Sequence, residues 1–184
     1  MTRRLSLLLL VVGTGLLGPG AARAEAQAIT AQDLLDAWDG MTAMVVESVR
    51  LMPADRFDYV PTDPLRDFAD QVNHTTITNF GFAGAVGAGA PTMDLPDPSD
   101  APSDKDSVLH YLEASFEHFR SGLETLSDDD LSAEVPWGPE QNRRMITRLK
   151  AFLIISEHLH REHGKTMIYL RENGIAPAPA RGWR

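Results

Sequence analysis

Cysteine is absent from the chain. Its absence excludes disulfide bonds, a thiol nucleophile, a cysteine-bound zinc site and an iron–sulfur cluster held by the protein's own thiolates. A chain of 184 residues is long enough to bury a stable apolar core without disulfides. Any metal ion must therefore be bound by histidine, aspartate or glutamate side chains.

Positive charge is scarce as well. The chain has 17 lysines and arginines against 26 aspartates and glutamates, which gives a formal net charge of −9. Nucleic acids and anionic lipids attract proteins through lysine and arginine side chains. We therefore expect no nucleic-acid partner and no anionic membrane surface as a partner.

The apolar run at residues 5–17 is shorter than the roughly 20 residues of a transmembrane helix. It follows Arg3 and Arg4 and precedes a small-residue cleavage motif that ends at Ala24. This order predicts a signal peptide over residues 1–24 and a mature domain over residues 25–184, periplasmic or secreted, without stable membrane insertion after cleavage. Cleavage removes three arginines and no acidic residue, so the formal charge changes from −9 to −12. Because the arginine pair partly resembles a twin-arginine signal, the Sec and twin-arginine routes both stay open.

Four segments have apolar residues at three- and four-residue spacing, which is typical of amphipathic helices. No convincing strand alternation separates them. Thr30 and Ser103 each precede an aspartate by three residues, which predicts a capping box at the first and third helices. Pro64 is favoured in the first turn of the second helix, and Gly174 ends the fourth. The predicted helices cover residues 30–52, 64–80, 103–126 and about 139–173.

The connection between the second and third helices, residues 81–104, is rich in glycine and then in proline. A connection of this length in a compact domain is usually functional or spans the bundle. We therefore predict an all-α protein, a four-helix bundle with a long crossover between helices 2 and 3. The crossover is expected to be a lid, a cavity wall or a disordered link.

The fourth predicted helix has three kinds of face. One stripe is apolar and includes Met145 and His163. The expected solvent face carries charged residues, namely Lys150, Glu157, Arg161 and Lys165. His158 and Glu162 lie on a seam between the two.

His158 and Glu162 are four residues apart, so their side chains meet on one helix surface. Two such ligands can hold one cation, with a third ligand from another helix, most naturally His74 on the second. Imidazole and carboxylate together suit zinc, nickel, iron or manganese. The spacing thus predicts a divalent metal site of His74, His158 and Glu162; the alternative is a group of ordinary polar residues. His110 and His118, on the third helix, are expected to face solvent.

Three segments together resemble the DinB-like superfamily of bacterial four-helix bundles, which includes thiol-transferase and maleylpyruvate-isomerase relatives. They are "MPADRFDYVPTDPLRDFADQVNH", "LSDDDLSAEVPW" and "SEHLHREHGKTMIYLRENGIAPA". The resemblance implies metal ligands at His74 and His158, and places Glu162 where a histidine is usual. His163 is displaced by one residue, and it would replace Glu162 only through a helix distortion, because an undistorted helix separates His158 and His163 by roughly 140°.

The resemblance implies a secreted metal-binding protein, a hydrolase or a thiol transferase, acting on an unknown small-molecule substrate. No catalytic residue is assigned; Glu162 would serve as a base if it does not bind metal, and Tyr169 would orient a ligand or substrate. The alternative is a non-catalytic periplasmic binding or scaffold module with a degenerate metal site, or more weakly a metal carrier or sensor. A homodimer is also implied, with the stripe that carries His163 as its candidate surface.

Overall fold

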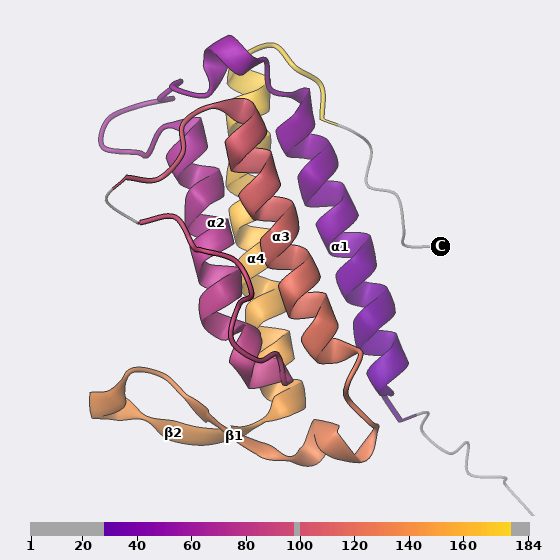
Figure 1. The fold of residues 1–184 in the computed structure, drawn as a ribbon. Helices are drawn as coiled ribbons and strands as arrows, with labels where there is room; N and C mark the ends of the chain where they lie inside the picture. Colours follow the sequence, from indigo (N-terminus) through magenta and orange to yellow (C-terminus); the bar gives the residue numbers. More distant parts are fainter. Residues whose placement is uncertain (1–27, 98–99, 178–184) are drawn as a thin grey trace, which may run out of the picture.

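The computed structural model describes residues 28–97 and 100–177. Four helices form a bundle, and a short hairpin joins the third to the fourth (Figure 1). The main elements are α1 (Ala31–Leu51), α2 (Phe68–Ala83), α3 (Lys105–Leu123), β1 (Glu134–Trp137), β2 (Arg144–Thr147) and α4 (Arg148–Glu172). Short 3-10 helices lie at Ala54–Arg56, Gly84–Val86, Asp129–Ser132 and Glu140–Asn142. The predicted all-α bundle is confirmed.

The crossover between α2 and α3 returns the chain along the length of the bundle, so that α2 and α3 run in the same direction (Figure 1). α1 and α4 both run in the opposite direction. α1 and α2 each pack against both α3 and α4. The α2–α4 pair is therefore antiparallel, and this pair carries the candidate site.

The core is built from the apolar stripes that the spacing predicted. Trp38 of α1 is fully buried and stacks on Phe119 of α3, with ring centroids 3.9 Å apart. Its indole N–H donates to the carbonyl of Phe116 at 3.2 Å, so burial leaves no unpaired donor. The capping box at Thr30 is confirmed, since its hydroxyl accepts from the backbone N–H of Asp33 and the Asp33 carboxylate accepts from that of Thr30.

Two predicted helix starts are corrected. α2 begins at Phe68 and not at Pro64, because the Asp67 carboxylate caps it by accepting from the backbone N–H of Asp70 at 2.8 Å. Pro64 lies in the preceding turn after a cis peptide bond, and Leu65 is 52% exposed instead of facing the core. The N-cap of α3 is Asp104, one residue after the predicted Ser103.

The predicted fourth helix is too long at its start. Residues 134–147 form an antiparallel hairpin, in which Glu134 pairs with Thr147. Its strands have four residues each and bury few side chains, which gives too little alternation to detect in sequence. Met145 lies in β2 and is 53% exposed, so it is not part of the α4 core stripe. Trp137 stacks on Phe82 of α2, with centroids 4.9 Å apart, and so ties the hairpin to the bundle.

Within the described residues, no helix is long and apolar enough to cross a membrane. The predicted signal peptide over residues 1–24 lies outside the described residues. Export, periplasmic location and the domain limits at residues 25–184 stay predictions.

Candidate metal site

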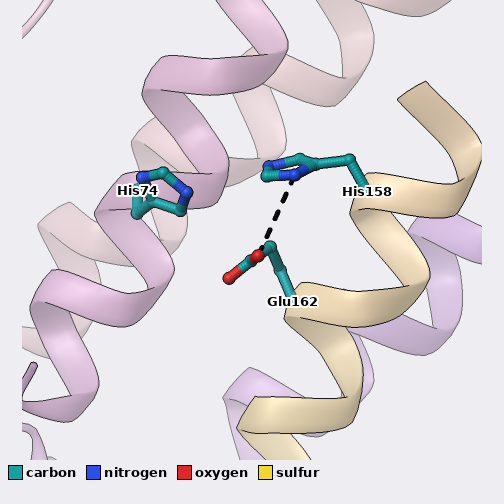
Figure 2. A group of neighbouring side chains, drawn as sticks. All are labelled: His74, His158 and Glu162. Carbon is teal, nitrogen blue, oxygen red and sulfur yellow. Dashed lines mark ion pairs between the residues drawn. The ribbon is translucent and has the colours of Figure 1, made fainter. Parts of the chain in front are cut away.

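His74 on α2 and His158 and Glu162 on α4 point toward one another (Figure 2). Each offers one ligand atom, and these atoms all lie within 4.8 Å of one another. The three residues predicted from sequence therefore come together. Their binding of a metal stays a prediction.

Helical geometry explains how these side chains meet. His158 Nδ1 lies 3.9 Å from Glu162 Oε1, as expected for residues four apart on one helix face. His74 faces them across the antiparallel α2–α4 contact, and its ring centroid lies 5.5 Å from that of His158 at an interplanar angle of 68°. Two rigid helices thus fix the three side chains.

Glu162 is buried, with 2% of its surface exposed, and its carboxylate is held by two neighbours. Gln71 of α2 donates to Oε2 at 2.7 Å, and the Lys165 ammonium donates to both oxygens at 2.9 and 2.8 Å. Burial raises the pKa of Glu162, but the hydrogen bonds from Lys165 and Gln71, together with the positive charge of Lys165, leave it below its usual value. The carboxylate is therefore ionised at neutral pH. Lys165 was expected on the solvent face, and its side chain is 43% exposed, but its ammonium also binds Glu162.

The two imidazoles are neutral at neutral pH. Burial lowers the pKa of both His74 and His158, and the positive charge of Arg66 lowers that of His74 further. An N–H of Arg161 lies 2.9 Å from His158 Nδ1, while Nε2 is buried and has no hydrogen-bond partner among the described residues. A buried polar atom without a partner costs free energy.

These donors fit a divalent cation. Neutral imidazole and ionised carboxylate are the forms in which the side chains bind metals, and three protein ligands leave a coordination position open. Ligation through Nε2 of His158 requires the ring proton on Nδ1, so Arg161 would have to move its N–H away. The Arg161 side chain is 55% exposed, which leaves it free to do so.

The remaining histidines lie apart from this cluster. Nε2 of His163 is 2.9 Å from the Ser48 hydroxyl of α1, and His163 is buried in the core. His163 therefore points away from His74 and His158 in this structure, and its part of the stripe packs in the core. The choice of third ligand and the homodimer stay predictions. His160 and His110 are exposed, whereas His118 is half-buried against Phe80, contrary to the expectation of a solvated side chain.

A pocket of about 530 Å³ lies beside the cluster. It is formed by the segment before α2, the start of α2 and the last turns of α4, with lining residues Pro61, Pro64, Leu65, Arg66, Gln71, Lys165, Ile168 and Tyr169. Gln71 and Lys165 both line the pocket and bind Glu162, so the pocket and the cluster share a wall. None of the three cluster residues lines the pocket itself. A second cavity, of about 470 Å³, lies between α1 and α3 and shares no residue with the pocket or the cluster.

Sequence reasoning missed Gln71, Lys165 and Arg66. The detectable signal was their spacing: Gln71 precedes His74 by three residues and Lys165 follows Glu162 by three, which places each on the same helix face. Arg66 lies outside any helix, so helical spacing gave no signal for it. Tyr169 donates to the Arg66 carbonyl at 2.6 Å, so its hydroxyl holds the segment before α2.

Comparisons with solved structures identify the same architecture. A DinB-like protein from Bacillus cereus is 11% identical with a TM-score of 0.67, and covers 83% of this chain and 99% of its own. A DinB-like protein from Bacillus subtilis is 18% identical with a TM-score of 0.64, and covers 82% of this chain and 99% of its own. YfiT from Bacillus subtilis is 16% identical with a TM-score of 0.60, and covers 87% of this chain and 97% of its own. It is described as a probable metal-dependent hydrolase with an unusual four-helix bundle topology. At these identities the likeness establishes the fold alone.

No sequence among curated proteins matches this chain significantly. A family model does: the DinB superfamily model matches residues 21–167, which include α1, α2, α3 and most of α4. The chain therefore belongs to the DinB superfamily.

Proposed function

We propose that this protein is a metal-dependent hydrolase that binds a divalent cation through His74, His158 and Glu162. The observation that carries the proposal is the convergence of three ligand atoms within 4.8 Å beside a pocket. YfiT, which has the same fold, is described as a probable metal-dependent hydrolase. Zinc, nickel, iron and manganese all suit two imidazoles and one carboxylate.

The chain's own residues prepare the site. Gln71 and Lys165 fix the Glu162 carboxylate, which limits its motion; Oε2 accepts two of these hydrogen bonds and Oε1 accepts one. When bound, a divalent cation supplies Lewis-acid polarisation of a water or a carbonyl group. The hairpin, through Trp137 on Phe82, covers the end of the α2–α4 pair that lies beyond His158.

We further propose that the protein acts after export, in the periplasm or outside the cell, on a small molecule. This rests on the signal-peptide pattern of residues 1–24 and on the acidic composition. A homodimer stays a prediction that the superfamily resemblance supplies. Thiol transfer is the second chemistry that the same cluster would support.

One observation favours a second function. The Lys165 ammonium already neutralises the Glu162 carboxylate, so the cluster is electrostatically satisfied by the chain alone. This is what a non-catalytic periplasmic binding or scaffold module with a degenerate metal site would need. In that case, added metal would leave thermal stability unchanged.

Elemental mass spectrometry on mature protein, purified from its periplasm without an affinity tag, tests the proposal. We expect near-stoichiometric metal in the wild type and loss of metal in His158→Ala and Glu162→Ala. His160→Ala is the matched control, since His160 is an exposed histidine on the same helix. Metal-loaded protein is then assayed for hydrolysis of amide and ester substrates. If the wild type contains no metal, and added zinc, nickel, iron or manganese leaves its thermal stability unchanged, the scaffold function is supported instead.

A further inference from the structure

The pocket beside the cluster has a distinct charge. Among the described residues that line it, Arg66 and Lys165 are cationic and none is acidic. The chain as a whole is strongly acidic, with a formal charge of −9, so a wall with two cations and no acid is a local reversal. A pocket of about 530 Å³ falls within the size range of small-molecule sites.

Of the two cations, Arg66 has more N–H donors available to a ligand. Within the described part of the chain, no hydrogen bond or ion pair engages its guanidinium, while its backbone carbonyl is fixed by Tyr169. The Lys165 ammonium donates two of its three N–H groups to Glu162, which leaves one N–H available to a ligand. Arg66 lines the same pocket as Gln71 and Lys165, which both bind Glu162 of the cluster.

Much of the remaining pocket lining is apolar. Leu65 and Ile168 are 52% and 51% exposed although both are large aliphatic residues. They line the same pocket as Arg66, with Pro61 and Pro64 beside them. An exposed aliphatic surface next to a guanidinium that has no partner among residues 28–97 and 100–177 suits a ligand that has an acyl or alkyl part and an anionic end.

We propose that this pocket binds a small amphipathic amide or ester that bears a carboxylate, with the carboxylate on Arg66 and the apolar part on Leu65 and Ile168. This inference rests on the proposed hydrolase function, because it places the scissile bond toward His74, His158 and Glu162. Hydrolysis adds the oxygen of water to the acyl carbon, breaks the C–N or C–O bond and delivers a proton to the leaving nitrogen or oxygen. It needs no reactant besides water.

A matched pair of probes isolates the carboxylate. N-hexanoylglycine carries it, and N-hexanoylglycinamide replaces it with a neutral amide of similar size. Binding to the full mature protein is measured by isothermal titration calorimetry, and hydrolysis by release of glycine or glycinamide. We expect the wild type to prefer the carboxylate probe by roughly tenfold, the scale of one charge-assisted hydrogen-bond pair.

Variants then assign the preference to residues. Arg66→Gln should abolish the preference by weakening only the carboxylate probe, and Arg66→Lys should keep part of it. Ile168→Ala should weaken both probes alike. Arg143→Gln is the control, since it removes the same charge at an exposed site in the hairpin.

The outcomes separate this inference from the proposed function. Arg66-dependent binding of N-hexanoylglycine without hydrolysis of either probe supports the pocket and counts against the hydrolase. Equal binding or hydrolysis of both probes, unchanged in Arg66→Gln, overturns the pocket while leaving the hydrolase intact. Failure of both probes to bind also overturns the pocket.

Discussion

Removal of the Lys165 ammonium is the sharpest test of how the Glu162 carboxylate is held. In Lys165→Met the carboxylate stays buried and keeps the Gln71 hydrogen bond at 2.7 Å and the longer ion pair with Arg161 at 3.7 Å. Breaking a fully buried pair costs about 3–5 kcal/mol. Lys165 is 43% exposed, however, so water can replace part of what is lost, and we expect a loss of about 1–2 kcal/mol in the free energy of unfolding.

Urea unfolding, followed by circular dichroism in the presence of a metal chelator, measures this loss. Lys150→Met is the control because Lys150 is exposed near the start of α4, where removing a positive charge should be neutral or slightly stabilising. Glu162→Gln supplies the second arm. In that background the carboxylate is gone, so Lys165→Met should cost little, and the two changes should be strongly non-additive.

Metal completes the prediction. A divalent cation on Glu162 replaces the missing positive charge, so added metal should raise the free energy of unfolding of Lys165→Met. The increase is up to about 2.7 kcal/mol when the free metal concentration is a hundred times its Kd. Two results would refute the reasoning: a Lys165→Met stability within about 0.5 kcal/mol of the wild type, a size typical of surface changes, or an equal loss in the presence and absence of Glu162.

Three further predictions concern other parts of the molecule. Ser48→Ala leaves Nε2 of His163 without its partner and should lower stability by about 1 kcal/mol in urea unfolding, whereas no loss would show that the pair contributes nothing. Hydrogen bonds from Ser107 lower the pKa of Asp104 in the folded state, so its stabilising effect is complete above the unfolded pKa near 4 and is lost as pH falls through the folded pKa. Asp104→Asn, which keeps the cap, should therefore flatten the stability profile below about pH 4, and an unchanged acid slope would count against this origin. His74→Ala should remove the stabilisation by added metal without unfolding the protein, as thermal melts with and without zinc would reveal; a retained shift would exclude His74 as a ligand.

The helices and two of the three cluster residues could be predicted because local spacing determines them. His158 and Glu162 meet through the geometry of a single helix, and the buried stripe around Trp38 follows from the same period. His74 came from the resemblance and from its place on the neighbouring helix. Its distance to His158 depends on the α2–α4 packing, which the sequence does not state.

The features that were missed depend on tertiary contacts or on very short elements. The hairpin buries only Val135 and Ile146 among its eight strand residues, a pattern too short for period-two detection. The start of α2 depends on the choice between Pro64 and Asp67, both favourable near helix starts. Lys165 was assigned to solvent because its angular position allows it, yet its long side chain reaches back to Glu162.

The charge on these residues bears on whether Glu162 marks a degraded metal site. The superfamily resemblance places a histidine at position 162, and a carboxylate there adds one negative charge to a buried cluster. Lys165, one helical turn further along, adds one positive charge at 2.8 Å from the same carboxylate. Together, Glu162 and Lys165 therefore have a formal charge of zero, the same as a neutral imidazole, so a bound cation would meet no extra charge from this pair. The donor atom changes from nitrogen to oxygen. A harder oxygen donor shifts preference toward metals such as manganese and iron without making the site repel a cation. A glutamate at this position is thus compatible with a working site, and the effect of added metal on the stability of Lys165→Met decides whether the ammonium accompanies a metal or stands in its place.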